Sequence, residues 1–318
     1  MPSSNFGAVE HYITLFDSNY LPMGLCLHGS LMRHAGPFVL WILCMDELVE
    51  RNLRQLDLPH VRLIALADAE NDALRGVKNS RTRGEYCWTI TPFTPDLVFA
   101  RDPSAARATY IDADLFFYTS PMPLFAELDA AGKDVLITEH AFAPRYECAA
   151  ENGRFCVQFM PFRRTDAAAR VSAWWQERCI EWCYARIEDG KCGDQKYLDV
   201  WPELFGDAVH VLSNHDLALG PWNAQHRFAL AGAPVTPVFY HFHSLRIVEK
   251  NRLRLFTGYR IGAARALYDA YLLAMREVVA TLSAAGIEVP TLPEPPEPQG
   301  WLRRLARRVT GQLEYAVI

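Results

Sequence analysis

The stretch Ala108-Thr109-Tyr110-Ile111-Asp112-Ala113-Asp114-Leu115-Phe116-Phe117 joins an apolar, β-rich run to two carboxylates spaced two residues apart. Because strand side chains alternate between faces, Asp112 and Asp114 would point the same way if one strand continued through both. Two like charges at the end of a buried strand are costly unless a positive group neutralises them. Hard divalent cations favour carboxylate oxygens, so the pair predicts a cation site.

The sequence before this pair alternates strand and helix patterns. It predicts strands over 11–16, 38–45 and 61–66, with helices over 21–32 and 46–56 between them. The middle strand is apolar throughout, as expected when both faces of a sheet are covered. This alternation predicts an α/β fold with a parallel sheet flanked by helices, in which ligands bind beyond the carboxyl ends of strands. A further strand is predicted over 108–117; it carries the acidic pair, which falls at such an end.

The sequence after the pair continues with mixed patterns. It predicts a helix over 124–131, strands over 134–138 and 155–162, a long helix over 166–187 and a last domain helix over 267–282. The Pro-rich run that follows predicts a stiff, extended linker.

Composition limits the class of protein. The chain has 318 residues, half of them hydrophobic, which is enough for one large domain or two modest ones. A net charge of -5 argues against a general nucleic-acid-binding protein. Its eight cysteines contain no Cys-x-x-Cys pair, which predicts scattered reduced thiols in the core. No basic segment followed by an apolar stretch opens the chain, so we expect a cytoplasmic protein.

Four blocks together resemble a known family. Residues 110–117 resemble the Asp-x-Asp segment of GT-A-type glycosyltransferases, especially the family 8-like enzymes. Phe-Asp-Ser-Asn-Tyr-Leu at 16–21 resembles their first strand-to-helix turn, which holds the nucleoside. Gly-Asp-Gln-Lys-Tyr-Leu-Asp at 193–199 resembles their Asp-Gln block near the reacting sugar. Tyr-His-Phe-His-Ser at 240–244 resembles the late His block that supplies a third metal ligand.

The resemblance, which covers roughly residues 9–260, implies a fold and an activity. The implied fold is a single GT-A-like domain over 1–286, with a mixed, mostly parallel central sheet, followed by a linker over 287–299 and a basic amphipathic tail helix over 300–318. The implied activity is metal-dependent transfer of a sugar from a nucleotide-diphosphate sugar, UDP-linked, to a glycan or lipid-linked glycan acceptor. Retention of anomeric configuration is the outcome typical of family 8.

The resemblance also implies the metal ligands. Asp112, Asp114 and His241 would hold Mn²⁺ or Mg²⁺, which neutralises the charge that develops on a departing diphosphate. Histidine is a ligand that suits Mn²⁺ better than Ca²⁺. His243 would share a strand face with His241, but the family block favours His241.

The donor would contact side chains from several blocks. Tyr20 offers a flat face for a uracil ring, while Asp17 either reads the base or caps a helix. The basic stretch over 78–86 either binds the diphosphate or the sugar of the donor, or is an exposed charge run. After the His block the chain departs from the family pattern, so the cation at the β-phosphate is either Arg246 or Lys250. The residues expected to contact the donor are Phe16, Asp17, Tyr20, Arg81, Arg83, Asp112, Ala113 and Arg246.

Two further sets concern the reacting sugar and the acceptor. Asp194 and Gln195 are the expected catalytic residues, with the carboxylate on sugar hydroxyls and the amide near the anomeric carbon; the alternative is a pair that merely begins a helix. An amide is a poor nucleophile, so direct displacement by Gln195 is a weak mechanism. The segments 221–223 and 256–259 are candidate acceptor loops, or simply packed loops.

The tail has its own pattern. In residues 300–309, Trp301, Leu302, Leu305 and Val309 fall on one side and four arginines largely on the other. Such a helix, detached by the Pro-rich run, is typical of a peripheral contact with anionic lipid at the inner face of a membrane. The alternative is a helix packed on the domain or on a sister chain.

Two other classes of protein stay open. A haloacid-dehalogenase-like phosphohydrolase also uses Asp-x-Asp, but on its first strand. A catalytically silent sugar-nucleotide-binding module would keep the fold without the reaction.

Overall fold

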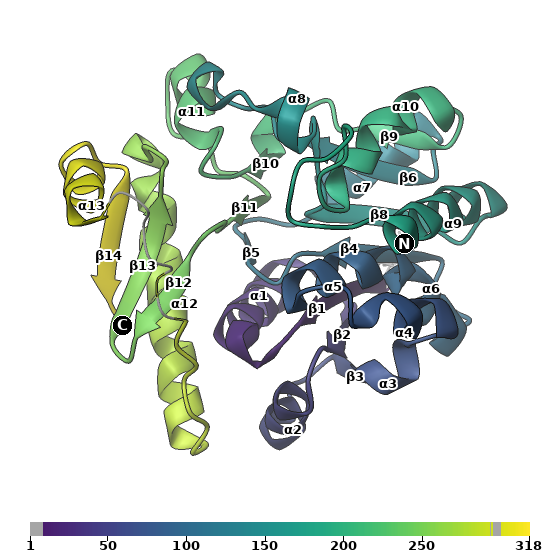
Figure 1. Cartoon of the computed structure of the whole chain (residues 1–318), viewed down its shortest axis with the longest axis horizontal. Helices are drawn as coiled ribbons and strands as arrows, with labels where there is room; N and C mark the ends of the chain where they lie inside the picture. The colour runs from purple at the N-terminus through teal and green to yellow at the C-terminus, as the bar shows by residue number, and fades with distance from the viewer. Residues whose placement is uncertain (1–8, 293, 295–299) are drawn as a thin grey trace, which may run out of the picture.

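The structure is a computed structural model that describes residues 9–292, 294 and 300–318. Four parallel strands form the first half of a central sheet, each paired with the next (Figure 1). In spatial order they are β3 (Val61–Ala65), β2 (Phe38–Cys44), β1 (Glu10–Phe16) and β4 (Arg107–Ile111). Helices connect them, as the alternating pattern predicted.

Antiparallel pairing begins beyond β4. Strand β8 (Phe159–Arg163) runs antiparallel to both β4 and β6 (Val135–Glu139). Strand β9 (Val209–Val211) is parallel to β6, and the short β7 (Phe155–Cys156) is antiparallel to it. The sheet is therefore mixed and mostly parallel, which confirms the predicted fold class.

Side-chain caps explain where several helices begin. Asp46 accepts a hydrogen bond from the amide of Val49 at 2.7 Å, and Thr82 and Glu85 form a capping box. The helices are α1 (Leu21–His34), α2 (Glu47–Leu56), α3 (Leu66–Ala69), α4 (Asp72–Lys78), α5 (Arg83–Ile90), α6 (Thr94–Arg101), α7 (Met122–Ala131), α8 (Ala149–Asn152), α9 (Asp166–Glu181), α10 (Trp201–Leu204), α11 (Ala224–Ala231), α12 (Arg265–Ala284) and α13 (Gly300–Val309). Short 3₁₀ helices are η1 (Ser18–Tyr20), η2 (Thr91–Phe93), η3 (Pro144–Tyr146), η4 (Gln195–Val200), η5 (His215–Leu217) and η6 (Gly262–Ala264).

The expected single strand over 108–117 is wrong, because it divides at the acidic pair. Strand β4 ends at Ile111, and β5 (Leu115–Phe117) joins a second sheet with β11 (Phe239–His241) and β10 (Ala218–Leu219). The amide of Leu115 donates to the carbonyl of Asp112 at 3.2 Å and closes a turn between the two sheets. The carboxylates therefore lie in a turn that links the sheets, not on one strand face.

A third sheet changes the description of the tail. It contains β12 (Arg246–Glu249), β13 (Arg252–Thr257) and β14 (Leu313–Val317), all antiparallel. Helix α13 ends at Val309, and Gly311, with φ of +67°, lets the chain reverse into β14. The expected helix over 300–318 is therefore too long, and its last residues are not detached. The division at 286 and 299 stays a prediction, and residues 293 and 295–299 lie outside the described part.

Two other predicted elements are shorter than expected. The strand over 155–162 is divided into β7 and β8 by Val157 and Gln158. Helix α9 ends at Glu181 instead of 187, because Trp182 is extended (φ −156°, ψ 122°). Among the described helices, none combines the length and the apolar character needed to cross a bilayer. Figure 1 shows the third sheet with α12 on one side of the molecule, the central sheet on the other, and β5 and β11 between them.

Candidate metal centre

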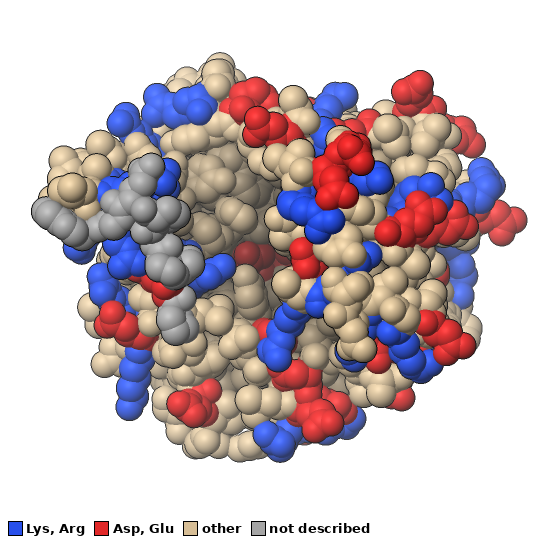
Figure 2. Space-filling model, viewed as in Figure 1, with Lys and Arg blue, Asp and Glu red and all other residues tan. Residues whose placement is uncertain are grey.

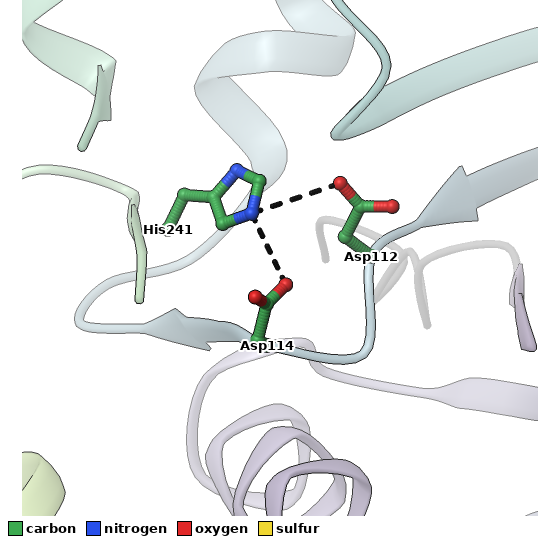
Figure 3. Close-up of side chains that lie close together, drawn as sticks. All are labelled: Asp112, Asp114 and His241. Carbon is green, nitrogen blue, oxygen red and sulfur yellow. Dashed lines mark ion pairs between the residues drawn. The ribbon is translucent and has the colours of Figure 1, made fainter. Parts of the chain in front are cut away.

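Asp112, Asp114 and His241 converge where the first two sheets meet (Figure 3). The turn after β4 carries both carboxylates, and β11 carries the histidine. His241 pairs with Leu115 across the second sheet, and this pairing places the histidine beside the acidic turn. The Nε2 atom of His241 lies 3.1 Å from Oδ1 of Asp114 and 3.8 Å from Oδ2 of Asp112. One ligand atom from each residue lies within 4.8 Å of the other two.

The charges in this group are strongly coupled. Burial raises the pKa of Asp112 to about 7, while His241 opposes the shift and Asp114 adds to it. Burial also disfavours the charge on Asp114, but the nearby His241 overrides this and lowers the pKa of Asp114. Asp114 in turn raises the pKa of His241 well above its usual value against the effect of burial. The raised pKa values of Asp112 and His241 favour proton binding by this group when no ion is present. A divalent cation would compete with those protons for the same ligand atoms.

Solvent can reach the carboxylates. The side chains of Asp112 and Asp114 are 23% and 17% exposed, whereas that of His241 is 8% exposed. Figure 2 shows a hollow near the middle of this face, with acidic atoms on its floor and basic side chains on its rim. Two carboxylates that solvent can reach, beside one imidazole nitrogen, fit Mn²⁺ or Mg²⁺ with coordination positions left for a ligand.

Two residues that the sequence interpretation missed support these ligands. The Tyr110 hydroxyl donates to Oδ1 of Asp112 at 2.7 Å. The Nδ1 atom of His241 lies 3.1 Å from Oε1 of the buried Gln158. Tyr110 precedes Asp112 by two residues, and Gln158 interrupts an apolar run; both signals were present in the sequence.

The nucleoside block has a local structural role. Asp17 caps η1, accepting from the amide of Asn19 at 2.9 Å, as the helix-cap alternative predicted. Its other oxygen accepts from Nη1 of Arg83, also at 2.9 Å. Phe16 is buried against Gly24, where an added Cβ would lie 2.5 Å from the ring. Donor contacts by Asp17, Arg83 and Phe16 stay predictions.

Tyr20 and Arg246 lie near the metal ligands. Burial raises the pKa of Tyr20 to about 12, Asp114 adds to the rise and Arg246 opposes it. The half-buried Arg246 begins β12, and its Nε has no hydrogen-bond partner among the residues that the structure describes. Lys250, the other candidate, is exposed in the turn between β12 and β13. Arg246 is therefore the better placed of the two to meet a phosphate.

Arg81 lies in a different environment. Its guanidinium stacks on the Tyr184 ring, with a centroid distance of 3.9 Å, and donates to the carbonyl of Ile180 at 3.3 Å. These contacts tie Arg81 to the segment at the end of α9, whereas Arg83 contacts the nucleoside block. The donor contact expected of Arg81 therefore has no support from its placement and stays a prediction. Ala113 is buried between the two carboxylates.

Asp194 is a buried carboxyl group whose charge interacts with that of Asp112. It is 6% exposed, and burial raises its pKa to about 8, with a further rise from Asp112. Gln195 begins η4, as its alternative predicted, and its amide donates to the carbonyl of Asn152 at 2.8 Å. Their expected catalytic roles stay predictions.

The first acceptor loop packs inward. Trp222 Nε1 and Asn223 Nδ2 both donate to the carbonyl of His140 at 2.8 Å, and both side chains are buried. The Trp222 ring meets the rings of His241 and His243 edge-on at 5.3 and 5.9 Å between centroids. This loop therefore forms a wall of the site. Tyr259, from the second loop, is only half-buried and lies 6.3 Å from the His243 ring.

The chain is similar in sequence to a known protein. No protein-family model matches the chain. YfnF of Bacillus subtilis strain 168, an uncharacterised protein, is 34% identical over 258 residues, which cover 76% of this chain and 84% of YfnF.

Solved structures agree on the fold. The bifunctional glycosyltransferase WbbM has a TM-score of 0.52 at 14% identity, over 87% of this chain and 52% of WbbM. The glycosyltransferase GlyE of Streptococcus pneumoniae TIGR4 has a TM-score of 0.50 at 15% identity, over 89% of this chain and 65% of GlyE. The chain thus spans about half of the WbbM chain and about two thirds of GlyE. It belongs to the same family as YfnF and has the GT-A fold, which confirms the fold that the resemblance at residues 110–117 implied.

Proposed function

We propose that this protein transfers a sugar from a nucleotide-diphosphate sugar to a glycan acceptor. The observation that carries the proposal is the solvent-accessible group of Asp112, Asp114 and His241, which lies beyond the carboxyl end of β4 in a GT-A fold. WbbM and GlyE, which share the fold, are both glycosyltransferases and support the same reaction class. A phosphohydrolase of the haloacid dehalogenase kind would need its acidic pair after the first strand, whereas here the pair follows the fourth.

Each side chain has a role in this proposal. Asp112, Asp114 and His241 would hold Mn²⁺ or Mg²⁺, which when bound would offset the charge of the leaving diphosphate. Arg246 adds a fixed positive charge for the phosphates. Asp194, kept neutral by burial, would donate a hydrogen bond to a sugar hydroxyl, as a protonated carboxyl group can. The charges of Asp114 and Asp112 act on Tyr20, so its ring lies near the ion that would bind the diphosphate and would contact the attached nucleoside.

The finer parts of the proposal are UDP as the nucleotide, Mn²⁺ as the preferred ion, retention of configuration and a lipid-linked acceptor. The amphipathic α13 supports a membrane-linked acceptor, because Leu302, Leu305 and Val309 are exposed beside its arginines. A cytoplasmic location at the inner face of a membrane is consistent with that helix.

The test is a donor-hydrolysis screen. Purified protein is incubated with a panel of sugar nucleotides, with Mn²⁺ or with EDTA, and release of free sugar and nucleoside diphosphate is measured. We expect metal-dependent hydrolysis of at least one UDP-sugar, and its loss in Asp114→Asn, which removes a ligand charge at nearly constant volume. A phosphohydrolase would instead leave the sugar nucleotides intact and release inorganic phosphate from a phosphomonoester, which the screen includes as a separate substrate.

Thermal shift with nucleotide separates the remaining alternative. UDP that binds only the folded state raises the free energy of unfolding by an amount that grows with the logarithm of the UDP concentration relative to its Kd. UDP stabilisation that requires Mn²⁺, without hydrolysis of any donor, would indicate the catalytically silent module. No shift with any nucleotide would contradict the proposal.

A further inference from the structure

Gln158 is a buried polar residue that lies between β7 and β8 and is 1% exposed. Its main-chain carbonyl accepts a hydrogen bond from the amide of Asp112 at 3.0 Å, which extends the β4–β8 pairing to the start of the acidic turn. An uncompensated buried amide is costly, so this side chain must have partners at both ends.

Its side chain has two buried partners on different elements. The Nε2 atom donates to Oγ1 of Thr138 in β6 at 2.9 Å, and Thr138 is fully buried. The Oε1 atom then faces Nδ1 of His241 at 3.1 Å. The amide is thus held between the central sheet and the second sheet, with its acceptor atom directed at the histidine.

This contact determines which nitrogen of His241 is available. A neutral imidazole has one N–H donor and one free nitrogen. Since Oε1 can only accept, it selects the form in which Nδ1 carries the proton. The free nitrogen is then Nε2, which faces the carboxylates of Asp114 and Asp112 at 3.1 and 3.8 Å.

We propose that Gln158 is a positioning residue that fixes the orientation and the Nδ1–H form of His241, so that Nε2 is presented to a divalent cation. The proposal rests on the metal site of the proposed function. Second partners of metal-binding histidines typically change metal affinity about 10- to 100-fold when they are removed.

The test is a Mn²⁺ titration of the full chain without nucleotide, followed by electron paramagnetic resonance of free and bound ion. Gln158→Met removes the acceptor at similar volume, and we expect Mn²⁺ to bind about 10- to 100-fold more weakly, with loss of the ¹⁴N coupling from imidazole. Gln158→Glu keeps an acceptor and should retain both wild-type affinity and the coupling. Thr138→Val removes the amide's anchor and should weaken binding in the same direction.

A matched control is Gln176→Met, which removes side-chain hydrogen bonds to Asp96 and the carbonyl of Pro92 in a different part of the molecule. Its Mn²⁺ affinity should equal that of the wild type. If the wild type binds Mn²⁺ and both Gln158→Met and Thr138→Val bind it equally well with the ¹⁴N coupling intact, the inference is wrong while the metal site stands. If the wild type binds no Mn²⁺, the metal site of the proposed function fails and this inference fails with it.

Discussion

Replacing Asp194 with Asn should stabilise the metal-free protein at alkaline pH and leave its stability at acid pH unchanged. The carboxyl group is 6% exposed, and burial raises its pKa from 3.8 to about 8. In the unfolded chain this group loses its proton near pH 3.8, but in the folded chain it keeps it until about pH 8. Between these values the folded state binds more protons, so its stability falls as pH rises.

The size of the effect follows from the interval between the two pKa values. Each unit corresponds to about 1.4 kcal/mol, so the rise from 3.8 to about 8 gives an upper limit of about 5–6 kcal/mol. Relaxation and water entry reduce such penalties, since buried sites behave with an effective dielectric constant near 20. For a chain of this length, about 1 kcal/mol changes Tm by roughly 2 °C. We therefore expect Asp194→Asn to raise Tm by about 2–10 °C above about pH 8.

The assay is thermal unfolding in EDTA between about pH 3 and pH 9, so that the range begins below the pKa of the unfolded carboxyl group, with circular dichroism recorded for both proteins. Asn can still accept from the main-chain amides of residues 194 and 195 that donate to the native carboxylate, so the two proteins should coincide at the acid end. A Tm difference that does not change with pH, or one in which the variant becomes less stable at alkaline pH, would refute the reasoning.

Three further predictions concern other parts of the molecule. Arg246→Gln should weaken UDP binding, measured by calorimetry, about 10- to 100-fold, because a charge-assisted hydrogen bond is lost, and it should leave Mn²⁺ affinity unchanged. Lys250→Gln is the exposed control, and an equal loss of UDP affinity in that variant would contradict the prediction. Mn²⁺ affinity should rise with pH through and beyond about 7, because Asp112 and His241 must both lose a proton to bind the ion, and calorimetry in buffers of different ionisation enthalpy should detect the released protons. Binding that is independent of pH would count against this ligand set. Replacing Leu302, Leu305 and Val309 with Ser should reduce binding to anionic vesicles without lowering Tm, since these side chains are exposed; unchanged sedimentation with vesicles would exclude α13 as the contact.

The sequence predicted the features that depend on local pattern. Apolar runs and helix caps located β1, β2 and α1 to within two residues, because burial and capping depend on nearby side chains. The acidic pair followed from residue type and spacing, and His241 from the family resemblance; the structure brings these three candidate ligands together.

Non-local pairing produced the differences. The division of the strand over 108–117 depends on the Gln158 carbonyl and on β11, which are distant in sequence. Strand β14 pairs with β13, about 60 residues earlier, so the tail alone showed only its helical pattern. The inward packing of Trp222 and Asn223 depends on the His140 carbonyl, and no property of that loop's own sequence distinguishes it from an exposed acceptor loop.

The proposed reaction requires that Asp112, Asp114 and His241 hold an ion that also binds the nucleotide diphosphate. Electron–nuclear double resonance of Mn²⁺ bound together with UDP measures both contacts at once. We predict ¹⁴N coupling from His241 and ³¹P coupling from the diphosphate on the same ion, with the nitrogen coupling lost in His241→Ala. UDP that binds equally well in EDTA, or bound Mn²⁺ with no phosphorus coupling, would contradict the claim.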